Sequence, residues 1–165
     1  MALYDTIFEQ LFLFCKNSDD LNKTGINFFN NGKYAEAIAC FNKSLALNPR
    51  NSKSWYNKGL VSKKIGNYDD ALFCYDQALI LDPNYLSALN SKANLLSLSG
   101  LYQKARECYD AILDKDPAYS DALWNKGLLL KTIGFDNETK LCFEKWQKMT
   151  SGRIDDVNQF TQNIK

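Results

Sequence analysis

The sequence predicts an all-α fold, a superhelix of antiparallel helix pairs, on the strength of three observations. Residues recur at an interval of 34 positions, apolar residues between them keep a helical period, and glycine and proline interrupt that period at fixed points. The recurring residues are Gly32, Gly66, Gly100 and Gly134, Tyr34, Tyr68 and Tyr102, Ala37, Ala71 and Ala105, and Pro49, Pro83 and Pro117. A unit repeated in this way buries its apolar face against its neighbours, so the chain is predicted to be a stack of repeats.

Residues 1–17 are predicted to form an amphipathic helix. Apolar side chains between residues 3 and 15 fall within about half of a helix circumference, a stripe wider than the ~100° that covers one neighbour. Two interpretations remain open: a capping helix, and a docking or self-association element through Tyr4, Phe8 and Phe12. Acidic residues interrupt the apolar run and no basic region precedes it, so we expect neither a signal peptide nor a membrane span.

Each repeat is predicted to be a helix, a turn and a second helix. In residues 52–85, Gly66 suits the left-handed residue that ends a first helix, and Pro83 stops the second. Small residues such as Gly59 recur where two helices approach closely, and aromatic residues such as Tyr75 recur where a gap must be filled. We therefore expect these aromatic residues to form the core and not a cofactor site.

This unit resembles the tetratricopeptide repeat, and the match in residues 52–85 consists of Trp55, Gly59, Tyr68, Ala71, Tyr75, Ala78 and Pro83. The resemblance implies a right-handed solenoid of four repeats, at 18–51, 52–85, 86–119 and 120–153, with a C-terminal capping helix at 154–165. The fourth repeat departs from the pattern, since Trp146 and Ser151 stand where alanine and proline are expected. The pentatricopeptide repeat of RNA-binding proteins does not fit, because its period is longer and its groove is basic.

Composition narrows the range of functions. A formal net charge of +1 argues against nucleic acid as a partner. The chain has no histidine, and no phosphate-binding loop, nucleophile elbow or paired-cysteine metal motif occurs, so we expect no catalytic residue, no metal and no cofactor. Cys40, Cys74, Cys108 and Cys142 keep the repeat interval and are predicted to be small buried thiols, not disulfides, as suits a reducing cytoplasm.

In tetratricopeptide proteins the first helices line a concave groove. The resemblance implies that twelve residues of this chain line such a groove. They are Asn22, Ile26, Phe29, Tyr56, Leu60, Lys63, Lys64, Asn90, Asn94, Trp124, Leu128 and Lys131. Trp124 stands one residue after the core position that Trp55 fills, and one residue turns a helical side chain by ~100°, towards the groove. The asparagines suit the backbone of an extended peptide, and the lysines favour an acidic partner.

The sequence therefore predicts a non-enzymatic protein–protein interaction module that binds a peptide or protein segment of acidic or apolar character. The alternative is a structural role, in which the N-terminal helix drives a homodimer or larger assembly. Relatives that clamp the C-terminal carboxylate of chaperones use five positions, which here hold Asn22, Ile26, Asn57, Ser87 and Ser91. Only Asn57 matches, so chaperone-tail binding is not expected. We expect a cytoplasmic protein that binds neither nucleic acid nor membrane.

Overall fold

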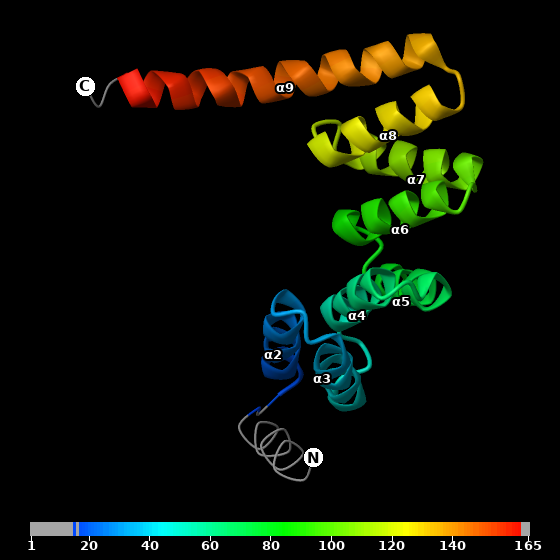
Figure 1. The fold of residues 1–165 in the computed structure, drawn as a ribbon, viewed down its shortest axis with the longest axis vertical. Helices are drawn as coiled ribbons and strands as arrows, with labels where there is room; N and C mark the ends of the chain where they lie inside the picture. The colour runs from blue at the N-terminus through cyan, green and yellow to red at the C-terminus, as the bar shows by residue number, and fades with distance from the viewer. Residues whose placement is uncertain (1–14, 16, 163–165) are drawn as a thin grey trace. The chain divides into compact units, whose positions relative to one another are not determined.

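The structure, a computed structural model, describes the backbone of Cys15 and of residues 17–162, and the side chains as far as Thr150. Every regular element in this part of the chain is an α-helix (Figure 1), so the predicted all-α class is confirmed. The predicted N-terminal helix falls almost entirely outside the described residues.

The described chain divides into two compact units, and the division falls after Ala88. Unit 1 contains two helix pairs, α2 (Ser18–Asn30) with α3 (Tyr34–Leu47) and α4 (Ser52–Lys64) with α5 (Tyr68–Leu81). Each pair packs side by side across a short turn, and α4 also packs against α3. The first helices therefore alternate with the second helices, as the repeat interval predicts.

Unit 2 contains most of α6 (Leu86–Leu98), followed by α7 (Tyr102–Lys115), α8 (Ser120–Thr132) and α9 (Asp136–Gln162). The structure differs from our expectation in α9, which runs for 27 residues through the predicted boundary at residue 153. The fourth repeat and the predicted capping helix 154–165 are thus parts of one helix as far as Gln162. The physical reason is Ser151, which stands where proline would stop the helix.

Glycine ends the first helix of every pair. Gly32, Gly66, Gly100 and Gly134 have φ angles of 72°, 87°, 75° and 82°, and no other described residue has a positive φ. This left-handed conformation is strained for a residue with a Cβ atom, which explains why glycine keeps the repeat interval. The turn predicted at Gly66 is confirmed.

Glycines also make room for aromatic rings within the helix pairs. The contacts pair Gly25 with Phe41, Gly59 with Tyr75 and Gly127 with Phe143. A Cβ atom on any of these three glycines would lie only 2.6 or 2.7 Å from a ring carbon. The predicted alternation of small and large core residues is confirmed, and it holds each pair at close range.

Buried thiols accompany these rings. Cys40, Cys74 and Cys142 are buried, as predicted, whereas Cys108 is half-buried. Burial raises the pKa of the Cys40 and Cys74 thiols to about 11, so both keep their protons at neutral pH. They act there as small apolar side chains.

Candidate functional site

Three side chains form an exposed stripe along α8 in unit 2, and we call Trp124, Leu128 and Lys131 the α8 stripe. Spacings of three and four residues place them on one helix face. Trp124 is 40% exposed and Leu128 44% exposed, whereas Leu123, at the core position, is only 2% exposed. The shift of the tryptophan by one position therefore turns it out of the core, as the sequence predicts.

The Trp124 ring is held in place although it is exposed. Its centroid lies 4.7 Å from that of Trp146 and 5.1 Å from that of Phe143, and both neighbours belong to α9. Trp146 stands where the repeat pattern expects alanine, so this departure supplies one wall of the site. A packed aromatic side chain loses little conformational entropy on binding, which suits an anchor in an interface.

The other predicted groove residues of unit 2 are bonded within the unit. Asn90 is buried, and its Oδ1 accepts a hydrogen bond of 3.3 Å from Asn125 Nδ2. Asn94 Oδ1 accepts a hydrogen bond of 2.5 Å from the Tyr109 hydroxyl. Burial raises the pKa of Tyr109, so this hydroxyl stays protonated and donates at neutral pH. Both amide oxygens therefore hold helices together.

Unit 1 presents aromatic and cationic groups on α4. The Tyr56 ring centroid lies 4.9 Å from that of Tyr85 and 6.0 Å from that of Tyr75. Burial raises the pKa of Tyr85 to about 12, so the Tyr85 hydroxyl keeps its proton at neutral pH. Leu60 and Lys63 are half-buried and Lys64 is exposed.

Two predicted groove residues of α2 lie against the core. Ile26 and Phe29 are partly buried and pack on the cluster of Ala37, Phe41 and Val61. They offer less surface to a ligand than the α8 stripe does.

The third, Asn22, belongs to a buried polar network that the sequence pattern did not predict. Asn22 is only 6% exposed, and its Oδ1 accepts hydrogen bonds from Asn57 Nδ2 at 2.9 Å and from Ser54 Oγ at 3.2 Å. Ser54 Oγ in turn lies 2.6 Å from Ser44 Oγ. The amide predicted to face a ligand is therefore bonded to the next repeat.

The network continues to the start of α2. Ser44 Oγ lies 2.8 Å from Ser18 Oγ, and Asn51 Nδ2 donates to that same Ser18 oxygen at 2.8 Å. Asn51 also caps α4, since its Oδ1 accepts from the Ser54 backbone N–H at 3.1 Å. The signal in the sequence was Ser44, at the position where later repeats carry Ala78 and Ile112, together with Ser54, at the position where they carry Ala88 and Ala122.

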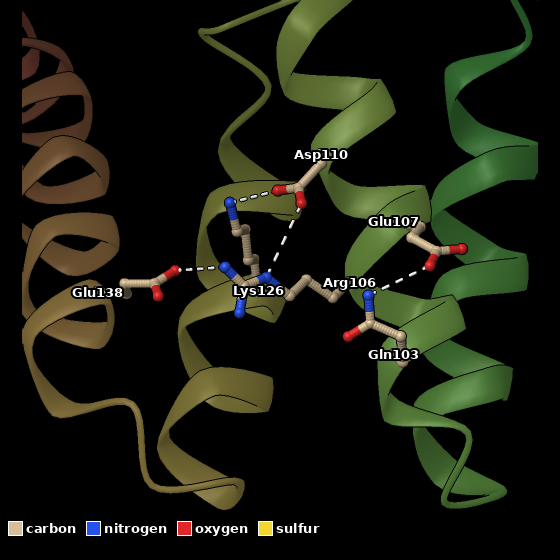
Figure 2. Close-up of polar contacts among 6 residues, drawn as sticks. All are labelled: Gln103, Arg106, Glu107, Asp110, Lys126 and Glu138. Carbon is tan, nitrogen blue, oxygen red and sulfur yellow. Dashed lines mark hydrogen bonds and ion pairs between the residues drawn. The ribbon is translucent and has the colours of Figure 1, made fainter.

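A group of charged residues joins three helices of unit 2 (Figure 2). Arg106 of α7 donates from Nη2 to Glu138 Oε2 of α9 at 2.9 Å, and its Nε lies 3.9 Å from Asp110 Oδ2. Lys126 of α8 pairs with the other oxygen of Asp110. The Arg106 guanidinium also lies 5.4 Å from the centroid of the Phe135 ring. This charge cluster links α7 to α8 through Lys126 and to α9 through Glu138.

A hollow of about 900 Å³ lies along a different face of α2. Its walls come from Cys15, Asp20, Lys23, Thr24, Asn27, Phe28, Asn31 and Lys33. None of the twelve predicted groove residues lines it. No described group of three or more histidine, cysteine, aspartate or glutamate side chains is suited to hold a metal ion.

Two further predictions concern membranes and the N-terminus. Among the described helices, none has the combination of length and apolar content that a membrane span needs. Tyr4, Phe8 and Phe12, the predicted self-association residues, lie outside the described residues.

Four family models match the chain. The model described as tetratricopeptide repeat matches residues 52–85, two others of the same description match 74–107 and 92–130, and one described as TPR repeat matches 25–66. The matches together run from residue 25 to residue 130. No curated protein sequence is similar enough to the chain to count as a relative.

Solved structures resemble the chain over most of its length. The crystal structure of MamA has a TM-score of 0.80 at 21% identity, over 89% of this chain and 86% of that one. A tetratricopeptide repeat protein from Parabacteroides merdae ATCC 43184 has 0.73 at 23% identity, over 81% and 54%. The first TPR of Spaghetti (RPAP3) bound to the HSP90 peptide SRMEEVD has 0.69 at 20% identity, over 73% and 95%. At these identities the similarity shows the fold, an all-α superhelix of repeats.

Proposed function

Because the chain belongs to the tetratricopeptide repeat family, we propose that it is a non-enzymatic protein–protein interaction module that binds a segment of a partner protein along its first helices. The fold indicates an interaction scaffold but assigns no partner. The observation that carries the proposal is the α8 stripe, where a packed but exposed tryptophan stands beside an exposed leucine and an exposed lysine.

The stripe defines the chemistry of the bound segment. Trp124 and Leu128 offer an apolar contact, and Lys131 ends the stripe in the last turn of α8. On α4 of unit 1, Lys63 and Lys64 end the helix in the same way. An apolar side chain followed by an acidic residue fits this order, with the lysines contributing mainly to the association rate.

The asparagines take a supporting role in this proposal. Asn22 and Asn90 each accept a hydrogen bond from an asparagine of the following repeat, so they hold adjacent first helices in register. Asn94 takes a similar role through its bond with Tyr109. The residues that contact the partner are Trp124, Leu128 and the lysines Lys63, Lys64 and Lys131.

The segment is not a chaperone C-terminal tail. One similar structure was solved with an HSP90 peptide. Of the five clamp positions in this chain only Asn57 matches, and its amide donates to Asn22 inside unit 1. A carboxylate placed there would meet none of the lysine or arginine side chains that the clamp requires.

The proposal is tested by capture of partners on immobilised protein from extracts of the native cell. We expect Trp124→Ala with Lys131→Glu to reduce recovery of specific partners by about tenfold or more, as loss of an aromatic anchor does. The matched control is Leu141→Ala with Lys140→Glu, which makes the same kinds of change at two exposed positions of α9. Equal recovery by both double variants contradicts the proposal, provided that circular dichroism shows both to be folded.

Self-association through Tyr4, Phe8 and Phe12 is the second candidate, favoured by the wide apolar stripe in the sequence of residues 3–15. Light scattering of the intact chain is compared with that of a chain lacking residues 1–14. The truncation keeps Asn17, which caps α2 by accepting from the Asp20 backbone N–H. A monomer in both cases rules this candidate out, and a dimer lost on truncation supports it.

A further inference from the structure

The outer face of α5 in unit 1 carries large apolar side chains that the fold does not use. The buried face of this helix is formed by Ala71, Cys74, Tyr75 and Ala78. On the opposite face Phe73 is 56% exposed and Ile80 70% exposed. These two residues are seven positions apart and so lie on one face, two helix turns or about 10 Å from each other.

Trp55 of α4 extends this surface. Its ring centroid lies 5.9 Å from that of Phe73, with an angle of 81° between the ring planes, an edge-to-face contact. The indole Nε1 donates a hydrogen bond of 3.0 Å to the Pro49 carbonyl, which fixes its orientation. We call Trp55, Phe73 and Ile80 the α5 outer patch. It has the aromatic composition and the preset geometry of an interface anchor.

The packing of the repeats does not require these residues. At the position of Phe73, α3 carries Ala39 and α7 carries Glu107. At the position of Ile80, the same helices carry Ala46 and Asp114. The second repeat therefore differs from its neighbours at the two outward positions of its second helix, where a polar or small residue suffices.

The charges around the patch indicate what covers it. Asp69 and Asp70 are exposed in the first turn of α5, and α5 contains no lysine or arginine. Lys58 stands at the edge of the patch, and its Nζ lies 5.7 Å from the centroid of the Trp55 ring. The first turn is thus an acidic border beside an apolar surface, and a partner of opposite charge complements it.

We propose that the α5 outer patch is a docking surface for a basic amphipathic helix of a partner protein. The apolar stripe of that helix packs on Trp55, Phe73 and Ile80, and its lysine or arginine side chains meet Asp69 and Asp70. Apolar residues two turns apart on the partner match the spacing between Phe73 and Ile80. This surface lies in unit 1 and the α8 stripe in unit 2, so substitutions can test the two surfaces separately.

The probe is a fluorescein-labelled helical peptide of about 18 lysine and leucine residues, with the leucines on one face. Its binding to the intact protein is measured by fluorescence anisotropy. We expect Phe73→Ala with Ile80→Ala to weaken binding about tenfold or more, because two exposed apolar contacts are lost. Asp69→Asn with Asp70→Asn is expected to weaken binding about threefold and to flatten its dependence on salt.

Two controls separate this surface from others. Leu47→Ala removes another apolar side chain of unit 1, one that is 62% exposed, and leaves binding unchanged. Trp124→Ala with Lys131→Glu, which tests the α8 stripe, also leaves binding unchanged. A peptide with glutamate in place of lysine is expected not to bind.

Three results overturn the proposal. The first is equal affinity of the Phe73→Ala, Ile80→Ala variant and the unmodified protein for the lysine peptide. The second is equal binding of the glutamate peptide. The third is a dimer of the unmodified protein, seen by light scattering, that the same double variant converts to a monomer, because the patch is then occupied by a second copy of the chain.

Discussion

The two units join their consecutive repeats in different ways at the same repeat positions. In unit 1 the interface is a hydrogen-bonded network that includes Ser44 and Ser54, both fully buried. In unit 2 the equivalent positions hold Ile112 and Ala122, also fully buried. One backbone geometry thus accepts a polar or an apolar interface, provided that every buried polar group has a partner.

The two units also differ in the charged residues at their surfaces. Unit 2 joins its helices with the charge cluster of Arg106, Asp110, Lys126 and Glu138. In unit 1 the positions of Arg106 and Asp110 hold Ile38 and Asn42, so the same cluster has no counterpart there. At these positions unit 1 therefore joins its repeats through buried hydroxyl groups, whereas unit 2 joins them through the apolar side chains of Ile112 and Ala122 and carries a charge cluster at its surface. The two arrangements predict different responses to substitution, pH and salt.

The largest effect is expected when a polar residue enters the apolar interface. Ile112→Ser should lower the free energy of unfolding by about 3–5 kcal/mol, because it leaves a cavity and a hydroxyl without the partners that Ser44 has in unit 1. Urea unfolding followed by circular dichroism measures the change. The control is Ile112→Val, with an expected cost of about 1 kcal/mol. Equal costs for the two variants contradict the contrast.

Alkaline pH should act through the buried thiols. The pKa of Cys74 is raised from 9.0 to about 11, so its contribution to stability is complete below about pH 9 and declines as pH rises towards 11. Over this window the thiol contributes a slope of roughly 1.4 kcal/mol per pH unit. The free energy of unfolding, measured across this pH window, should therefore fall less steeply for Cys74→Ala than for the unmodified protein. An unchanged slope shows that the thiol does not titrate differently in the folded and unfolded chains.

A smaller loss is expected when one hydroxyl leaves the polar network. Ser44→Ala should cost about 1–3 kcal/mol, because Ser18 and Ser54 each lose a bonding neighbour. The double variant with Ser54→Ala should cost less than the sum of the single variants, since the two hydroxyls share a bond. If the losses in free energy of unfolding of the two single variants add up to that of the double variant in urea unfolding, the two hydroxyls are not coupled. Ser99→Ala, at an exposed position, serves as the control.

The smallest effect is expected at the charge cluster. Glu138→Gln removes the charged partner of Arg106, and both side chains are partly exposed. We expect a loss below about 1 kcal/mol at low salt and almost none at high salt. Thermal unfolding at the two salt concentrations measures this. A loss that does not change with salt shows that the contact acts through packing.

Most of the fold could be predicted from the sequence, because residues that keep the repeat interval mark both the turns and the core. It located the left-handed glycines, the aromatic rings that fill the pairs, and the exposed position of Trp124. It did not show that α9 runs on past residue 153, although Ser151 in place of proline was the signal. The apolar spacing after residue 153 is the same in one long helix as in two short ones.

The role of Asn22 could not be predicted from the sequence for a different reason. An amide on the inner face of a first helix has the same appearance in a sequence whether it meets a ligand or another repeat. Its partner Asn57 lies in the next repeat at a slightly different position, as Asn125 does for Asn90. A search for polar pairs between consecutive repeats, and not within one, is the step that finds such bonds.

Photo-crosslinking in the native cell tests the binding surface in place. A benzophenone amino acid replaces Leu128 of the α8 stripe in one version of the protein. In a second version it replaces Leu141, an exposed residue of α9. Both positions are exposed to a similar degree, 44% and 51%. A binding surface on the α8 stripe predicts a distinct partner adduct from position 128 and none from position 141. Adducts from position 141 alone, or the same adducts from both positions, contradict it.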